Sequence, residues 1–230
     1  MEAIVLAGGF GTRLRSRLAD TPKAMAPIGG RPFLQIILDQ LLNAGCGRIV
    51  LSVGYLHRVI VETFGDEYRS IPLHYVIEST PLGTGGGIRS ALQEAVESSV
   101  LVLNGDTYLD ANLPEMLQNH VSFGRPITMA VTEVNDVSRY GGVLIESEHV
   151  TGFIEKGRTG QGWINAGVYT VDREFPWPRN LPDSFSFEKD TLAAYLDILR
   201  PGVVRCYGKF LDIGTPEDFD RAQTELSVGG

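Results

Sequence analysis

A glycine-rich stretch near the start of the chain has the composition of a phosphate-binding loop. It reads Leu6-Ala-Gly-Gly-Phe-Gly-Thr-Arg-Leu14 and directly follows a short apolar run. Glycine lets backbone N–H groups approach phosphate oxygens closely, and successive N–H groups can form a nest around an anion. On glycines alone, a tight structural turn is an equally good interpretation.

Two cationic side chains favour the phosphate interpretation. Arg13 lies inside the loop, and Lys23 follows ten residues later in Thr21-Pro22-Lys23. Both can donate charge-assisted hydrogen bonds to the same phosphate chain. The loop is not a dinucleotide fingerprint, because Leu14 occupies the third glycine position, and no Gly-Lys-Ser/Thr follows as in a Walker A loop.

The charge pattern is compatible with a small anionic ligand, although charge alone is more typical of a solvated basic face. The chain has 20 Lys and Arg against 28 Asp and Glu, a net charge of −8. Residues 10–31 carry five basic residues and one acidic residue, a local charge of +4, which leaves −12 for the rest. Such a field disfavours nucleic acid and anionic membranes as main partners, whereas a positive focus suits a polyphosphate.

Length and composition predict one soluble α/β domain over residues 1–230. With only Cys46 and Cys206, the sequence offers neither a disulfide framework nor a zinc ligand set. No stretch approaches the length of a membrane span, and Glu2 stands where a signal peptide would carry a basic residue. We therefore expect a cytoplasmic protein.

Strands and helices alternate in the first half of the sequence. This order builds right-handed βαβ units around a parallel sheet that is covered on both faces. The apolar runs predict strands over 3–6, 49–53, 73–77 and 100–103, and helices over 33–42, 56–64 and 88–96.

The second half is richer in strands, which we expect to extend the sheet edge and to form a small lobe over the substrate. Strands are predicted over 127–134, 142–145, 150–154 and 164–171, and helices over 187–199 and 216–226. The last helix has a capping signal, with Thr215 at the N-cap, Pro216 at the first helical position and Asp218 completing the pair.

Two aspartates occupy positions where ligands of open α/β sheets are usually bound. Asp106 follows the strand 100–103, and Asp212 follows Lys209-Phe-Leu211 at a similar turn. Carboxylate oxygens are suitable ligands for Mg²⁺. Taken singly, each aspartate is more typical of a turn or a helix cap, and the metal interpretation is preferred only for the pair within the matched motifs.

The complete set of motifs resembles the signature of the sugar-phosphate nucleotidyltransferases, in the family's order and over nearly the whole chain. The resemblance implies a Rossmann-like three-layer αβα sandwich with a mixed, mostly parallel central sheet and a small antiparallel sugar-binding lobe. Beyond the first loop, the matching motifs are Pro22-Lys-Ala-Met-Ala-Pro27, Gly30-Arg-Pro-Phe-Leu34, Pro81-Leu-Gly-Thr-Gly-Gly86, Asn104-Gly-Asp106, Phe153-Ile-Glu-Lys156, Asn165-Ala-Gly167 and Phe210-Leu-Asp-Ile-Gly-Thr-Pro216.

The family's reaction converts an NTP and a sugar 1-phosphate into an NDP-sugar and pyrophosphate. A phosphate monoester has a second pKa of about 6, so at neutral pH the nucleophile is already an anion and needs no general base. Catalysis then depends on positioning two anions and stabilising the departing pyrophosphate.

The resemblance implies a role for each matched residue. The catalytic set is Arg13, Lys23, Asp106 and Lys156. Asp106 and Asp212 would hold Mg²⁺, the implied cofactor. The sugar phosphate would contact Gly142, Glu155, Lys156 and Asn165. The nucleotide would contact Leu6, Gly8, Gly9, Gly11, Thr12, Arg13, Lys23, Glu78, Gly83 and Thr84.

Within the family, Phe185-Ser-Phe-Glu-Lys-Asp190 and the compact length are similar to guanylyltransferases that act on a heptose 1-phosphate and feed bacterial surface glycans. The implied partners are GTP and D-glycero-α-D-manno-heptose 1-phosphate. A mannose 1-phosphate guanylyltransferase and an N-acetylmuramate 1-phosphate uridylyltransferase remain alternatives. A non-catalytic sugar-nucleotide-binding regulator is a more distant one, because the implied catalytic set is intact. A homodimer is compatible with the sequence.

Glu78 predicts a preference for guanine. It follows the strand 73–77 and precedes Pro81-Leu-Gly-Thr84, so we expect it at the nucleoside end of the loop. An ionised carboxylate only accepts hydrogen bonds, and guanine presents two adjacent donors, whereas uracil and thymine present one. The open alternative is an exposed Glu78, with backbone atoms reading the base.

Overall fold

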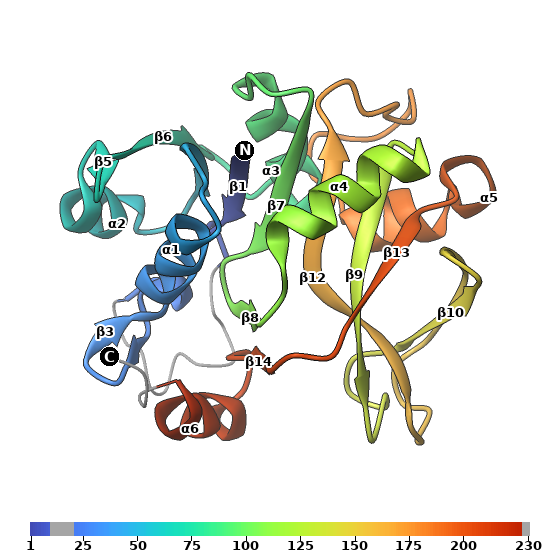
Figure 1. Ribbon diagram of the computed structural model, residues 1–230. Coiled ribbons are helices and arrows are strands. Elements are labelled where there is room, and N and C mark those ends of the chain that lie inside the picture. Colours follow the sequence, from blue (N-terminus) through green and yellow to red (C-terminus); the bar gives the residue numbers. More distant parts are fainter. Residues whose placement is uncertain (10–20, 227–230) are drawn as a thin grey trace.

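A ten-stranded mixed sheet forms the centre of the molecule (Figure 1). The computed structural model describes residues 1–9 and 21–226. The strand order is β10-β11-β13-β9-β12-β7-β1-β4-β6-β5. Four of these strands run parallel, as predicted: β6 (Ile71–Ile77), β4 (Arg48–Val53), β1 (Glu2–Leu6) and β7 (Ser99–Asn104).

Helices cover both faces of this sheet, which confirms the expected three-layer α/β architecture. Alternate strand residues point to opposite faces, so Val5 joins one core cluster while its neighbour Ile4 joins the other. The Val5 side packs against α1 (Phe33–Asn43), α2 (His57–Phe64), α4 (Leu113–Phe123) and α6 (Pro216–Glu225). The Ile4 side packs against α3 (Gly83–Gln93), a π-helix (Phe187–Ala193) and α5 (Leu196–Leu199).

The strands of the second half belong to the same sheet. β9 (Ile127–Val134) and β12 (Gly162–Asp172) are antiparallel, and β10 (Gly142–Glu146) and β11 (His149–Ile154) form a hairpin at the edge. A strand that the sequence analysis did not predict, β13 (Gly202–Cys206), lies between β9 and β11 and runs parallel to β9. The predicted extension of the edge is therefore confirmed, with one more strand than expected.

β12 leaves the central sheet part-way along its length. It pairs with β7 only from Val168 onward, whereas its first residues pair with β9 alone. A register shift between Asn165 and Tyr169 marks the change. The first half of β12 therefore projects beyond β7, together with the end of β9 (Figure 1).

Two predicted helices have different limits from those expected. The helix predicted over 88–96 begins at Gly83 and ends at Gln93, because the glycines form its first turn. The helix predicted over 187–199 is divided into the π-helix and α5. In contrast, α6 has the predicted cap, since the Thr215 hydroxyl accepts a hydrogen bond from the Asp218 backbone N–H.

Short elements complete the fold and bring distant segments to the sheet edge. β8 (Thr107–Leu109) pairs with β14 (Phe210–Asp212), and β2 (Pro27–Ile28) pairs with β3 (Arg31–Pro32). β5 (Glu67–Tyr68) pairs with β6, and a short 3-10 helix spans Lys23–Met25.

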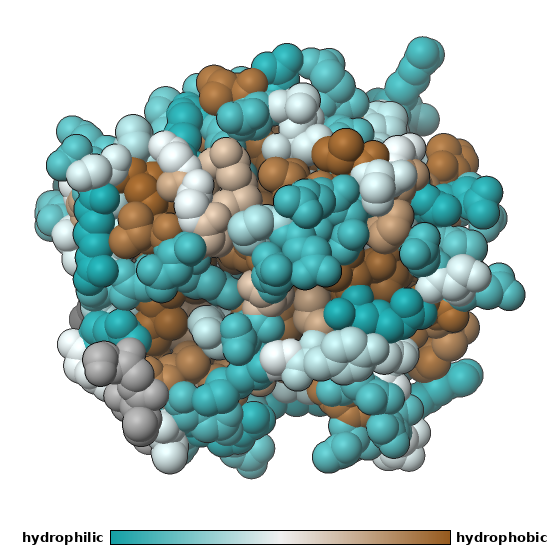
Figure 2. Space-filling view, in the orientation of Figure 1, coloured by the Kyte–Doolittle hydropathy of each residue, from teal (hydrophilic) through white to brown (hydrophobic). Residues whose placement is uncertain are grey.

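The face shown in Figure 2 is mainly hydrophilic, with apolar side chains in small separate patches. Within the described ranges, no helix has both the length and the apolar character needed to cross a bilayer.

Candidate active site

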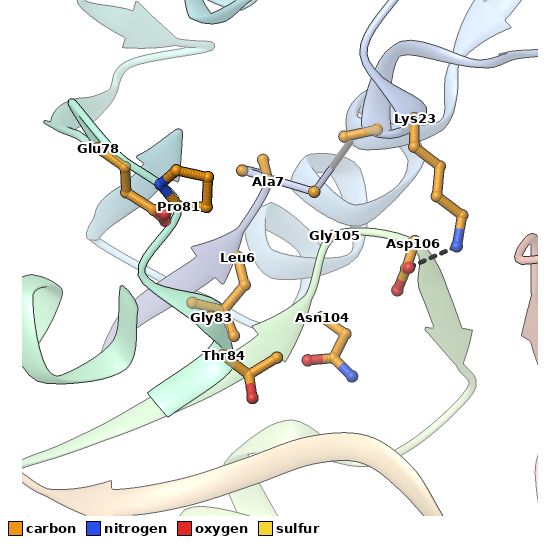
Figure 3. A pocket seen from close by; sticks show the side chains of 13 residues that line it. Leu6, Ala7, Lys23, Glu78, Pro81, Gly83, Thr84, Asn104, Gly105 and Asp106 are labelled. Carbon is orange, nitrogen blue, oxygen red and sulfur yellow. Dashed lines mark hydrogen bonds and ion pairs between the residues drawn. The ribbon is translucent and has the colours of Figure 1, made fainter. Parts of the chain in front are cut away.

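A cavity of about 260 Å³ lies where the carboxyl ends of β1 and β7 meet (Figure 3). Four segments line it: the loop after β1, the 3-10 helix, the approach to α3, and the turn after β7. Its lining residues are Leu6, Ala7, Gly8, Gly9, Lys23, Ala24, Glu78, Pro81, Gly83, Thr84, Asn104, Gly105 and Asp106. Most of the residues that sequence analysis assigned to the nucleotide and the metal therefore line one cavity.

The described part of the glycine-rich loop is held tightly against its neighbours. The Ala7 N–H donates to the Ser52 carbonyl at 2.8 Å, and the Gly105 N–H donates to the Leu6 carbonyl at 2.9 Å. A Cβ on Gly8 would lie 2.8 Å from Glu78 Oε1, so a larger residue there would displace the end of the Glu78 side chain. Gly11, Thr12 and Arg13 lie outside the described residues.

Lys23 and two carboxylates form the charged end of the cavity. Lys23 Nζ lies 2.5 Å from Asp106 Oδ2 and 3.8 Å from Asp212 Oδ1, and its side chain is only 13% exposed. The β8–β14 pair brings the aspartates together, because Asp212 pairs with Thr107 and the Ile213 N–H donates to the Asp106 carbonyl. Two turns that are 106 residues apart in the sequence thus provide one site.

Burial, and then the nearby charge of Asp106, raise the pKa of Asp212 above its usual value, while Lys23 partly opposes the rise. A cation between two neighbouring carboxylates offsets the repulsion between their charges. The site is therefore built to hold positive charge.

The residues present fit a magnesium ion. Mg²⁺ prefers oxygen ligands and is often bound by one or two carboxylates, with phosphate and water oxygens completing its shell. Asp106 and Asp212 supply the two carboxylates, and the described residues contain no cluster of three or more metal-binding side chains. In addition, the cavity-lining Asn104 has a buried Oδ1 that no described residue hydrogen bonds, which leaves an acceptor for a bound ligand.

Arg139 is a site residue that sequence analysis missed. Its guanidinium pairs with the buried Asp218 and lies 3.7 Å from Asp212 Oδ2. The Arg139 Cζ atom lies over the Tyr140 ring, 5.0 Å from the ring centroid. Only the fold brings these residues together, although Gly142, a predicted sugar contact, lies three residues further along the chain.

Glu78 lies across the cavity from Lys23 and Asp106 (Figure 3). Its Oε1 accepts a hydrogen bond from the Ser52 hydroxyl at 2.9 Å, and its Oε2 accepts one from the Leu82 N–H at 3.1 Å. Each carboxylate oxygen has two lone pairs, so Glu78 keeps capacity for two further donors. It is half-buried, not the fully exposed strand-end residue of the alternative interpretation.

The glycines at the start of α3 also allow another chain segment to approach closely. The segment 183–185 packs directly on them. A Cβ on Gly83 would lie 2.5 Å from the Phe185 carbonyl oxygen, and one on Gly86 would lie 2.4 Å from the Asp183 carbonyl oxygen. The Gly85 N–H donates a hydrogen bond to the Phe185 carbonyl oxygen at 3.0 Å. Gly83 and Thr84 nevertheless line the cavity.

The residues assigned to the sugar phosphate lie outside the cavity. Gly142 opens β10 opposite Ile154, and Glu155 and Lys156 follow in an exposed turn. Close packing of the chain around Gly141 and Gly142 keeps this turn near the start of β10. The structure thus gathers three of the four predicted sugar contacts at one end of the β10–β11 hairpin.

Asn165, the fourth predicted sugar contact, lies on the projecting half of β12. Its Nδ2 donates to the Tyr169 hydroxyl at 2.6 Å, and its Oδ1 accepts from the Gly167 N–H at 3.0 Å. Gly167 in turn packs against Asn104, which lines the cavity. Asn165 is therefore connected to the cavity wall through its own strand.

The chain is similar in sequence and structure to known nucleotidyltransferases. The family described as nucleotidyl transferase matches residues 2–228. D-glycero-α-D-manno-heptose 1-phosphate guanylyltransferases from Aneurinibacillus thermoaerophilus and Campylobacter jejuni are each 40% identical to this chain. The first alignment covers 98% of both proteins, and the second covers 95% of this chain and 97% of its relative. The crystal structure of HddC from Yersinia pseudotuberculosis complexed with GMP-PN superposes with a TM-score of 0.85, at 35% identity and over 98% of this chain and 99% of that one.

Proposed function

Because this chain belongs to the nucleotidyl transferase family, we propose that it transfers a guanylyl group from GTP to D-glycero-α-D-manno-heptose 1-phosphate. The products are GDP-heptose and pyrophosphate, for use in a bacterial surface glycan. The observation that carries the proposal is the 40% identity to heptose 1-phosphate guanylyltransferases over nearly the full length of both chains. We further propose that residues 1–230 form a single nucleotidyltransferase domain.

The site suits a displacement at the α-phosphorus of GTP. An oxygen of the sugar phosphate forms a bond to that phosphorus, and the bond to the bridging oxygen of the departing pyrophosphate breaks. The nucleophile is already an anion. The main requirement is therefore positive charge where the three phosphates of GTP meet the phosphate of the sugar. Lys23 supplies one such charge on the cavity wall, and Arg13 and Lys156 are proposed to supply others.

Asp106 and Asp212 are the residues that would hold Mg²⁺. When bound, the ion would neutralise phosphate charge and fix the orientation of the triphosphate. Lys23, which lies between the two carboxylates in the structure, would then be free to bind phosphate oxygens instead. Arg139 would continue to orient Asp212 through its other oxygen.

Glu78 is proposed to read the guanine base, and Glu78→Gln tests this role. Glutamine can keep both existing contacts, with its oxygen toward the Leu82 N–H and its amide group toward the Ser52 hydroxyl, which can rotate to accept. The substitution therefore removes the charge without removing the scaffold. We expect the GTP over UTP ratio of kcat/KM to fall about tenfold, since a charge that pairs with the correct base and is left unpaired by the wrong one discriminates between them.

Glu62→Gln on α2 is the matched control, because Glu62 is exposed and does not line the cavity. An unchanged nucleotide ratio in Glu78→Gln would assign base recognition to backbone groups. A wild-type preference for UTP would instead support the N-acetylmuramate 1-phosphate uridylyltransferase alternative.

A further inference from the structure

Glu188 on the π-helix has no role in the mechanism above, yet it is the centre of a hydrogen-bond network. Its Oε2 accepts from the hydroxyls of Thr84 at 2.7 Å and Ser186 at 3.0 Å. Its Oε1 accepts from the Tyr169 hydroxyl at 3.3 Å. Within the described ranges, the carboxylate is thus held by hydroxyl donors. π-Helical turns of this kind occur frequently at functional sites.

One arm of the network fixes a residue of the nucleotide cavity. Thr84 lies on the first turn of α3 and lines the cavity. Its hydroxyl gives its single proton to Glu188 and accepts from the Phe187 N–H at 2.9 Å. With both contacts made, the side-chain rotamer of Thr84 is determined by the π-helix.

The other arm reaches a predicted sugar contact. The fully buried Tyr169 gives its hydroxyl proton to Glu188 and accepts from Asn165 Nδ2 at 2.6 Å. Because the Tyr169 hydroxyl must point toward Glu188, it presents its lone pairs to Asn165. The orientation of the Asn165 amide therefore depends on the same carboxylate.

An ionised carboxylate is the group suited to this position. Both of its oxygens accept, so it can direct the hydroxyls of Thr84 and Tyr169 inward at the same time. In a partly buried setting such linked hydrogen bonds reinforce one another, and an unsatisfied member is costly.

We propose that Glu188 is a positioning residue that couples the nucleotide subsite to the sugar 1-phosphate subsite. This inference rests on the proposed function, since it takes Thr84 as a nucleotide contact and Asn165 as a sugar contact. By aligning both residues, Glu188 makes the affinity for each substrate depend on the geometry of the other subsite.

Glu188→Gln tests the proposal with little change in shape. In the wild-type protein the hydroxyls donate to both carboxylate oxygens. The NH₂ group of the glutamine can only donate, so the hydroxyl or hydroxyls that face it must accept instead. If the NH₂ group faces Tyr169, the Tyr169 hydroxyl receives two donors and its own proton loses its acceptor. We expect the KM values for GTP and for heptose 1-phosphate each to rise about tenfold, the effect of one buried unsatisfied group, with a smaller change in kcat.

The matched control is Asp190→Asn in the same π-helix. Asp190 is exposed, and its Oδ2 accepts from the Ser186 N–H, which asparagine can also do. A purely structural role for Glu188 predicts a lower melting temperature and lower kcat with both KM values unchanged, and that result would overturn the proposal. Wild-type enzyme that releases no pyrophosphate from GTP and the sugar phosphate would refute the proposed function itself.

Tyr169→Phe is a second test of the coupling, for use if the Glu188→Gln protein does not fold. The substitution removes one hydroxyl on the sugar arm and leaves the nucleotide cavity untouched. We expect the KM for GTP to rise about threefold nevertheless, because coupling of this kind is transmitted through a connected network. A GTP KM equal to that of the wild type would contradict the coupling.

Discussion

Asp106→Asn is expected to lower turnover at least about a hundredfold, the loss typical of removing one preorganised electrostatic element. Asparagine keeps the size of the side chain but removes the charge that pairs with Lys23 and would bind Mg²⁺. Steady-state pyrophosphate release at saturating substrates and Mg²⁺ measures the effect. We also expect the variant to need more Mg²⁺ for half-maximal activity.

Asp110→Asn is the control for this prediction, because Asp110 lies four residues further on and is exposed. The control should retain nearly normal turnover and the wild-type Mg²⁺ requirement. If folded Asp106→Asn protein also turned over at the wild-type rate, Asp106 would not be a metal ligand.

Lys156→Met is expected to lower kcat/KM for the sugar 1-phosphate about a hundredfold while leaving the affinity for GTP nearly unchanged. The reason is that a compact ammonium group offsets the phosphate charge of the acceptor sugar as it approaches the triphosphate. Lys156 lies outside the nucleotide cavity, in the exposed turn after β11 and beside the start of β10. Separate titration of each substrate distinguishes the two affinities.

Lys189→Met removes an equivalent exposed charge from the π-helix and should affect neither substrate. Equal weakening of GTP and sugar phosphate in Lys156→Met, or a loss confined to GTP, would exclude the proposed role of Lys156.

The parallel half of the fold could be predicted because its pattern is local. The four parallel strands β1, β4, β6 and β7 are mainly apolar runs that end at turns, and α1 shows a helical spacing of apolar residues. β13 was missed because its sequence, Gly-Val-Val-Arg-Cys, is short, and the segment becomes a strand by pairing with the distant β9 and β11. The break between the π-helix and α5 was missed for a similar reason, since both segments carry helix-compatible residues.

Site residues could be assigned from the sequence where each lies within a recognisable motif. Lys23, Asp106 and Asp212 were assigned from motifs and meet within 3.8 Å of the lysine nitrogen. Arg139 and Glu188 could not be found in this way, because their partners are distant in the sequence. The packing of segment 183–185 on the glycines of α3 could not be foreseen, because close packing of another chain segment selects the same residue as close approach of a ligand.

The most direct test of the account is a matrix of the four NTPs against several sugar 1-phosphates, scored by pyrophosphate release with Mg²⁺ present. The acceptors are D-glycero-α-D-manno-heptose, mannose and N-acetylmuramate 1-phosphates. We expect the highest kcat/KM for GTP with the heptose 1-phosphate. A higher value for mannose 1-phosphate or for UTP, or no release from any pair, would contradict the proposal that this chain is a heptose 1-phosphate guanylyltransferase.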